Sequence, residues 1–273
     1  MEKHKISIII ANYNNSNNLS KTINSIIMQK YKNIEIIIVD DNSTDNSRDI
    51  IFNFSNKYDF IKYIFLSKNR GAYYARNEAL KISSGDFITL LDSDDVYFGD
   101  FLSNNLDVYI QNEKEDKNFQ ILFSNIYRSM FTEMKLEDMN KLLELDMSKC
   151  KENNIDVKKN CFLGMATIFV KKTFFELYGM WRDDYYYGMD VELIQRYLVI
   201  KYEKFMNYEE LWLNINSNKM SECGIKMIPL MNYISQPMNN NNATVKCNKE
   251  ERNIIHKKCE EELKSDKYIV NKL

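Results

Sequence analysis

Two short runs near the N-terminus decide the fold: Ile6-Ser7-Ile8-Ile9-Ile10-Ala11 and Ile34-Glu35-Ile36-Ile37-Ile38-Val39. Both are dominated by β-branched residues without a polar face, which is typical of strands that are covered on both sides. Each run ends abruptly in polar residues, Asn12-Tyr13-Asn14 after the first and Asp40-Asp41 after the second. Leu19, Ile23 and Ile26 recur between them at helical spacing.

The same alternation continues to about residue 95. The pattern predicts a third strand over 61–66, a helix over 72–83 and a fourth strand over 87–91, which runs directly into Asp92-Ser93-Asp94-Asp95. A helix preceded by Ser43 or Thr44 as its N-cap is expected between the second and third strands. Alternating strands and helices predict an open α/β sheet, Rossmann-like and mainly parallel, with helices on its faces.

The rest of the chain is less regular. We expect a helix and a strand over 101–127, a loop-rich segment over 129–160, a strand over 165–170, and a helix over 172–178 that Gly179 ends in the left-handed conformation. A second helix starts near Gly188, and a charged amphipathic helix is expected over 250–264. We predict a nucleotide-binding half over 1–115, an acceptor-side half of the same domain over 116–237, and a linker with a C-terminal helix over 238–273.

Composition excludes several classes of function. The 273 residues include 37 Lys plus Arg and 39 Asp plus Glu, a formal charge of −2, so no basic stripe for nucleic acid is expected. The two histidines, His4 and His256, lie at opposite ends of the chain, which disfavours His-based triads and multi-His metal sites. The five cysteines form no C-x-x-C pair and indicate reduced thiols. No apolar run reaches the roughly 20 residues of a membrane helix, so we expect a soluble cytoplasmic protein.

The acidic residues at the strand ends carry the candidate chemistry. In open α/β sheets, ligands bind beyond the carboxyl ends of the strands, where Tyr13, Asp41, Asp92 and Asp94 are expected to converge. Carboxylates would repel a diphosphate unless a divalent cation lay between them, and Mg²⁺ or Mn²⁺ prefers such oxygen ligands. Two interpretations stay equally open from the residues alone: Asp92 caps the next helix, or the acidic segment holds a metal.

Four motifs in order resemble the nucleotide-sugar half of family 2 glycosyltransferases of the GT-A fold. They are Ile6 to Asn14, Val39-Asp40-Asp41-Asn42-Ser43-Thr44-Asp45, Asn69-Arg70-Gly71-Ala72-Tyr73-Tyr74-Ala75-Arg76-Asn77, and Gly85 to Asp95. The resemblance resumes at Tyr178-Gly179-Met180-Trp181 and Gly188-Met189-Asp190-Val191-Glu192-Leu193. It implies a transferase that moves a sugar from a nucleotide-sugar, a UDP-sugar by expectation, to an acceptor hydroxyl with inversion. A divalent metal, Mn²⁺ or Mg²⁺, and addition of a single sugar are expected.

The resemblance also implies roles for individual residues. Tyr13 packs on the base and Asp41 accepts the uracil N–H, with Ala11 and Ser93 also in the nucleotide-sugar site. Asp92 meets the ribose or the metal shell, Asp94 ligates the metal, and Asp190 is the base that deprotonates the acceptor. Arg76 either positions the phosphates or braces the nearby aspartates.

Two departures from the family pattern leave other functions open. Met189 replaces the first acid of a Glu-Asp pair, and the late stretch Trp212 to Ser217 offers asparagine in place of a metal-binding histidine. A degenerate transferase that binds nucleotide as a scaffold module is therefore one alternative. A nucleotidyltransferase is another, although 12–18 lacks the Gly- and Arg-rich phosphate loop of that class. The acceptor, whether glycan, lipid-linked or protein, and the oligomeric state are not determined by the sequence.

Overall fold

A computed structural model describes the chain over most of its length. The described residues are 3–97, 99–128, 161–162, 167–184, 189–206, 208–217, 219–235, 254–255, 257–258 and 261–263. The predicted segment 129–160, the run Tyr185-Tyr186-Tyr187 and the glycines Gly164 and Gly188 lie outside these residues.

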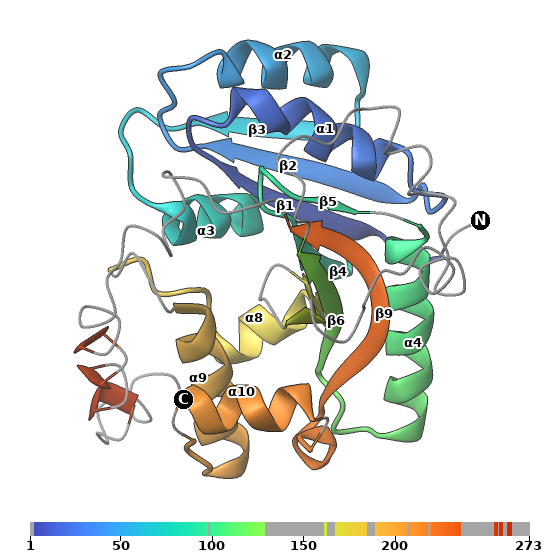
Figure 1. The fold of residues 1–273 in the computed structure, drawn as a ribbon, viewed down its shortest axis with the longest axis vertical. Helices are drawn as coiled ribbons and strands as arrows, with labels where there is room; N and C mark the ends of the chain where they lie inside the picture. The colour runs from blue at the N-terminus through green and yellow to red at the C-terminus, as the bar shows by residue number, and fades with distance from the viewer. Residues whose placement is uncertain are drawn as a thin grey trace.

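Within the described residues, a sheet of nine strands organises the molecule (Figure 1). Its first half is parallel, in the order β3-β2-β1-β4. These strands span Ile6–Asn12 (β1), Ile34–Asp40 (β2), Ile61–Phe65 (β3) and Phe87–Leu90 (β4). They confirm the predicted α/β core, and their parallel pairing places all four carboxyl ends at one edge.

The second half continues the same sheet as β8-β6-β9-β5, with β7 paired to β6. The bounds are Val96–Tyr97 (β5), Ile121–Arg128 (β6), Cys161–Phe162 (β7), Ile168–Lys171 (β8) and Ile225–Ser235 (β9). The join is antiparallel: Phe87, Ile88 and Thr89 of β4 oppose Lys171, Val170 and Phe169 of β8. The two halves therefore share one hydrogen-bonded sheet.

Helices cover both faces, as the all-apolar strands require. Alternation along β2 sends Ile36 and Ile38 to one apolar cluster and Ile37 and Val39 to another. The first cluster packs under α1 (Ser16–Ile27), α2 (Ser47–Lys57) and α4 (Phe101–Glu115). The second packs under α3 (Ala72–Ile82), α8 (Thr173–Tyr178), α9 (Met189–Tyr202) and α10 (Tyr208–Asn216).

Two local predictions were wrong. Helix α2 begins at Ser47 after Asn46, not after Ser43 or Thr44, because Asp45 forms a turn that accepts the Ser47 N–H at 3.0 Å. Gly179 ends α8 with a positive φ of 82°, but its ψ of 165° is extended and not left-handed helical. That combination of φ and ψ is almost confined to glycine. Glycine is therefore still required at this position, although for a different backbone conformation from the predicted one.

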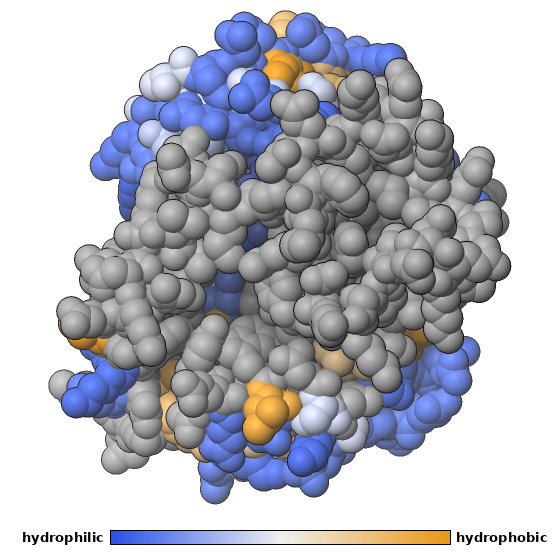
Figure 2. Space-filling view, in the orientation of Figure 1, coloured by the Kyte–Doolittle hydropathy of each residue, from blue (hydrophilic) through white to orange (hydrophobic). Residues whose placement is uncertain are grey.

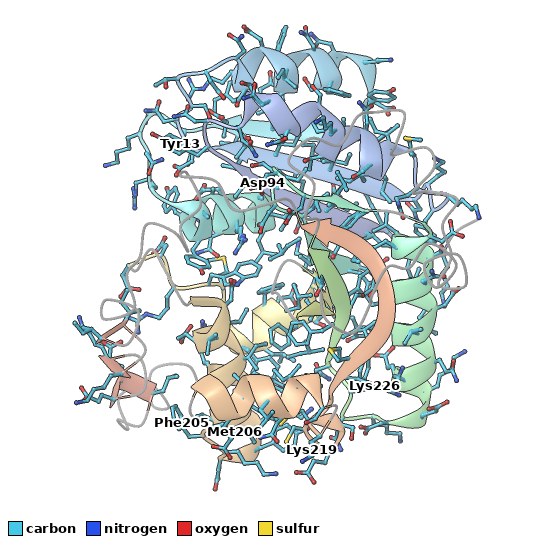
Figure 3. All side chains as sticks on the ribbon, in the orientation of Figure 1. Tyr13, Asp94, Phe205, Met206, Lys219 and Lys226 are labelled. Atoms are coloured by element: carbon cyan, nitrogen blue, oxygen red, sulfur yellow. The ribbon has the colours of Figure 1, made fainter. Side chains whose placement is uncertain are left out.

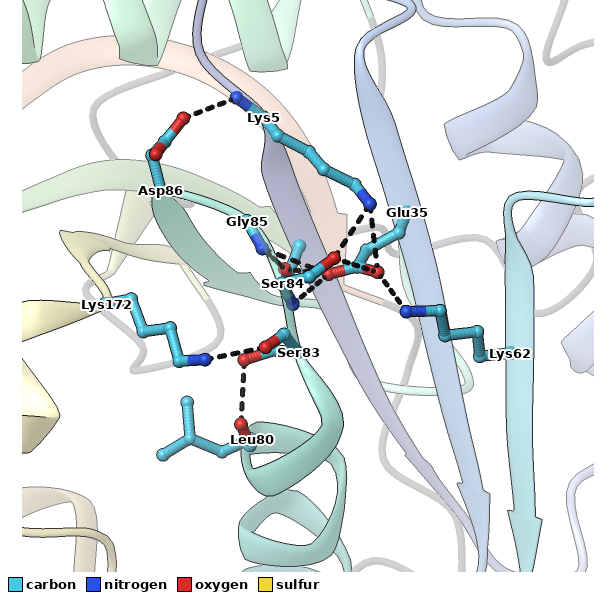
Figure 4. A network of polar contacts seen from close by, with 10 residues as sticks. Lys5, Glu35, Lys62, Leu80, Ser83, Ser84, Gly85, Asp86 and Lys172 are labelled. Atoms are coloured by element: carbon cyan, nitrogen blue, oxygen red, sulfur yellow. Dashed lines mark hydrogen bonds and ion pairs between the residues drawn. The ribbon is translucent and has the colours of Figure 1, made fainter.

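A buried carboxylate joins the amino ends of the strands, at the edge opposite the candidate site (Figure 4). Glu35 is 1% exposed and accepts hydrogen bonds from the Ser7 hydroxyl at 2.6 Å and from Lys62 Nζ at 2.8 Å. The Gly85 N–H donates to it at 3.1 Å, and Lys5 Nζ lies at 3.2 Å. Burial alone would raise the pKa of Glu35, but the hydrogen bonds from Lys62, Ser7 and Ser84 outweigh it and lower the pKa to about 2.

This network predicts a specific acid sensitivity. Because the folded-state pKa of Glu35 lies below its ordinary value of 4.5, its contribution to stability is present above pH 4.5 and is lost as the pH falls through about 2. The loss amounts to about 3 kcal/mol, since one pKa unit corresponds to about 1.4 kcal/mol. In urea unfolding between pH 5 and 2, Glu35→Gln is expected to be less stable than wild type at pH 5 and to show a flatter pH dependence. Equal slopes for the two proteins would contradict this assignment.

Two observations concern the apolar character of the helices and of the surface. Within the described ranges, no helix combines the length and apolar character that a membrane span needs. Figure 2 shows a mainly hydrophilic surface around α1 and α2 and a hydrophobic spot over α10, the helix in which Leu213 is 69% exposed. The described residues of the predicted C-terminal helix, which include Ile254 and Ile255, are helical.

Candidate active site

The loops that follow β1, β2, β3 and β4 form the candidate site, because the parallel strands deliver them to one edge. Figure 3 shows Tyr13 and Asp94, which follow β1 and β4, above α3 in the view. Tyr13 is 39% exposed, whereas Ala11 is half-buried at the end of β1 opposite Val39. An exposed aromatic ring beside a buried strand end is suited to stack on a planar base.

Asp40 holds the first two loops together. Its carboxylate is fully buried and accepts hydrogen bonds from Asn12 Nδ2 at 2.9 Å, the Ser43 N–H at 3.0 Å and Arg48 Nε at 2.8 Å. Arg48 also donates to the Leu66 carbonyl at 2.6 Å, which reaches the end of β3. Every polar contact of Asp40 is thus with the scaffold, and its role is structural.

Asp41 fixes the loop that leads into α3. Its two carboxylate oxygens accept the backbone N–H groups of Arg70 and Gly71, each at 2.7 Å. Gly71 adopts a φ of 89°, which allows both donors to point at one carboxylate. Burial raises the pKa of Asp41, against the two backbone hydrogen bonds that lower it. A carboxylate has about four acceptor positions, so capacity for a further N–H donor remains.

Ser93 links the loop after β4 to the loop after β1 and to α1. Its hydroxyl accepts a hydrogen bond from Asn15 Nδ2 at 3.1 Å, and its carbonyl accepts one from the Thr22 hydroxyl at 2.9 Å. Asn14 makes a similar link to the second loop, because its side-chain oxygen accepts the Thr44 N–H at 2.7 Å. These hydrogen bonds connect the loops after β1, β2 and β4 along one side of the candidate site.

Arg76 connects the donor-side and acceptor-side acids. It projects from α3 with 8% exposure, and its guanidinium donates to Asp92 Oδ1 at 2.8 Å and to Asp190 Oδ1 at 3.2 Å. Burial lowers the pKa of Arg76, but Asp190 and Asp92 more than compensate and raise it, so the guanidinium stays charged. These contacts match the alternative in which Arg76 braces the nearby aspartates. They bring together three residues that are up to 114 positions apart in the chain.

Asp94 has the electrostatics expected next to a cation site. Burial and the neighbouring charge of Asp92 raise the pKa of Asp94 to about 6. A divalent cation would relieve this repulsion, and hard carboxylate oxygens suit Mg²⁺ or Mn²⁺. Among the described residues, no group of three or more His, Cys, Asp or Glu side chains is arranged to hold a metal. The donor set therefore fits a cation only if bound diphosphate and water complete its shell.

The late stretch that includes Asn216 runs through α10. Helix α10 lies near the bottom of the view, well below Asp94 (Figures 1 and 3).

Two sets of polar contacts position Asp190 at the start of α9. Asn77 of α3 bonds the backbone of Trp181 on both sides, accepting its N–H at 3.1 Å and donating to its carbonyl at 2.7 Å. In α9, Arg196 pairs with Glu192 at 2.6 Å and donates to the carbonyls of Tyr178 and Met180. Trp181 is 2% exposed and packs on Phe175, so it is a core residue.

Tyr73 is a site residue that the sequence reasoning missed. Its hydroxyl donates to Asp190 Oδ2 at 3.3 Å. The available signal was its spacing, because residues three apart share a helix face and Arg76 was already a candidate.

Comparisons with known sequences point to one family. The family model described as Glycosyl transferase family 2 matches residues 7–165, more than half of the chain. One curated relative is the UDP-Glc:alpha-D-GlcNAc-diphosphoundecaprenol beta-1,3-glucosyltransferase WfgD of Escherichia coli, 28% identical over 244 residues, covering 87% of this chain and 90% of the relative. Another is the GalNAc(5)-diNAcBac-PP-undecaprenol beta-1,3-glucosyltransferase of Campylobacter jejuni, 33% identical over 156 residues, 56% of this chain and 48% of the relative.

Solved structures share the fold. The S. aureus TarS fragment 1-349 in complex with UDP-GlcNAc has a TM-score of 0.58 at 18% identity, over 88% of this chain and 60% of that one. The mannosyltransferase PcManGT from Pyrobaculum calidifontis, in complex with GDP-Man and Mn2+, has a TM-score of 0.59 at 13% identity, over 97% of this chain and 66% of that one. This chain therefore spans about 60% of the length of the TarS fragment. The architecture is the GT-A fold that the sequence predicted.

Proposed function

Because the chain belongs to glycosyl transferase family 2, we propose that it transfers a sugar from a UDP-sugar to a hydroxyl of a lipid-linked glycan, with inversion and one sugar per acceptor. The observation that carries this proposal is the buried Arg76, which pairs with both the donor-side Asp92 after β4 and the candidate base Asp190 at the start of α9. The WfgD relative, named as a transferase from UDP-Glc to a diphosphoundecaprenol-linked sugar, supports the choice of donor and acceptor.

Each residue has a defined task in this reaction. Tyr13 stacks on the base, Asp41 accepts its ring N–H, and Ser93 with Ala11 lines the nucleotide site. Asp94, with Asp92, would hold a divalent cation, which when bound supplies positive charge to the diphosphate leaving group. Asp190 accepts the proton of the acceptor hydroxyl as the oxygen attacks the anomeric carbon opposite the diphosphate. Burial raises the pKa of Asp190, which makes it a stronger base, while Arg76 opposes this rise.

A thermal-shift panel tests donor and metal together. We expect UDP to raise the Tm of the wild-type chain only with Mn²⁺ or Mg²⁺, and Asp94→Ala to lose most of this shift, because carboxylate and diphosphate oxygens hold the cation jointly. Asp107→Ala, a change of an exposed acid on α4, is the matched control and should behave as wild type.

Two outcomes would contradict this prediction. A larger shift with GDP or TDP than with UDP would overturn the base assignment. An unchanged UDP shift in Asp94→Ala would remove the metal role from that residue.

A further inference from the structure

The two oxygens of Asp190 have separate donors on one helix. Arg76 donates to Oδ1 at 3.2 Å and the Tyr73 hydroxyl to Oδ2 at 3.3 Å. Tyr73 and Arg76 are three residues apart and share a face of α3. The Arg76 guanidinium carbon lies 5.4 Å from the centre of the Tyr73 ring, so the two donors also contact each other.

Tyr73 has little freedom to move. It is 9% exposed, and its ring belongs to the apolar cluster under α3 and α9. A phenol ring has only two side-chain torsions, so packing of the ring fixes the direction of its hydroxyl. The helix itself is held by Asp41 at its N-cap residue, Gly71, and by the hydrogen bond from Asn77 to Trp181 in its middle. The donor is thus presented to Asp190 from a rigid support.

We propose that Tyr73 is a positioning residue for Asp190: its hydroxyl, paired with Arg76, fixes the rotation of the carboxylate that removes the acceptor proton. This inference rests on the proposed function, in which Asp190 is the base. Attachment at both oxygens restricts rotation about the Cβ–Cγ bond, which a single ion pair to Oδ1 would leave open. General-base catalysis depends on this orientation, because the accepting oxygen must face the hydroxyl at hydrogen-bond distance.

The charge environment of Asp190 determines the expected signature. The groups that face it are Arg76 and Tyr73 from α3, Asp92 after β4, and Trp181 before α9. Burial raises the pKa of Asp190 most strongly, Arg76 lowers it, Asp92 raises it, and the hydrogen bond from Tyr73 lowers it. Removal of the Tyr73 hydroxyl therefore raises the pKa of Asp190 and leaves the ring packing in place.

The test compares Tyr73→Phe with Tyr74→Phe, the same change one residue along. Tyr74 is half-buried, and the guanidinium carbon of Arg70 lies 4.1 Å from the centre of the Tyr74 ring. Tyr74 lies outside the proposed site. In Tyr73→Phe we expect kcat to fall roughly tenfold, the size of one hydrogen bond to a charged group, and the acidic limb of the kcat/KM profile to move to higher pH. The KM for UDP-sugar is expected to stay unchanged. Tyr74→Phe should match wild type in all three measurements.

A second measurement does not require activity. The carboxyl ¹³C signal of Asp190, assigned by its absence in Asp190→Asn, is titrated in wild type and Tyr73→Phe, and the variant is expected to have the higher pKa. If the NMR difference appears but no UDP-sugar is turned over by wild type, the positioning role stands and the proposed function fails. If wild type transfers sugar and Tyr73→Phe has an unchanged pH profile and an unchanged Asp190 pKa, the positioning role is overturned.

Discussion

Asp190→Asn is expected to lower the rate of sugar transfer by about 10²–10⁴-fold, the range for loss of a general base. Asparagine keeps the shape of the side chain and one acceptor oxygen, but it cannot take a proton. The Mn²⁺-dependent thermal shift with UDP should stay close to that of wild type, because Asp41, Asp92 and Asp94 are unaltered. The measurement is transfer from several UDP-sugars, together with hydrolysis of each sugar when no acceptor is present.

The matched control for this variant is Asp183→Asn. Asp183 is exposed on the loop just before α9 and loses a negative charge without losing a base. If Asp190→Asn keeps a tenth or more of the wild-type rate, Asp190 is not the base. If the wild-type chain binds UDP but turns over none of the sugars, the scaffold alternative motivated by Met189 is favoured.

The second large effect concerns stability. Glu192→Ala is expected to lower the free energy of unfolding by about 3–5 kcal/mol, because it leaves Arg196 as a buried cation without its carboxylate. The pair is almost fully enclosed, with Arg196 1% and Glu192 2% exposed. Urea unfolding at neutral pH measures the loss, and Glu176→Ala, which changes an exposed acid on α8, should be within about 0.5 kcal/mol of wild type.

A double variant separates charge from packing. Glu192→Met with Arg196→Met removes both charges and is expected to be more stable than Glu192→Ala alone, because no unpaired ion remains. The carbonyls of Tyr178 and Met180 still lose their donor, so wild-type stability should not be recovered fully. If the double variant is less stable than Glu192→Ala, the pair stabilises the fold mainly through the hydrogen bonds of Arg196 to those carbonyls.

The parallel core was predictable because its signals are local. Each of β1 to β4 is a short apolar run that ends in polar residues, and the order of elements permits few topologies. The strand β9 was missed because Pro229 interrupts its sequence pattern. In the structure the register with β6 shifts at Ser124 and Asn125, opposite this proline, so an irregular ladder accommodates the missing N–H.

The candidate site was predictable as a set of residues but not as a set of contacts. Asp41, Asp92 and Asp94 are marked by their position after strands, which a sequence pattern reveals. The bridge from Arg76 to Asp190 joins α3 to α9, and such a pairing depends on how two helices pack on one sheet face. The spacing of Tyr73 from Arg76 places both on one face of α3, but the contact of Tyr73 with Asp190 depends in the same way on how α3 and α9 pack.

The antiparallel ladder between β4 and β8 has a mechanical consequence. Many two-part enzymes trap their substrates by swinging one lobe against the other about a hinge. Here such a swing would pull apart the pairing of Phe87 with Lys171 and of Thr89 with Phe169 in the middle of the sheet. The backbone frame that separates Asp92 from Asp190 is therefore set before any substrate arrives. We therefore expect substrate entry and exit to depend on movements of loops and side chains above that frame.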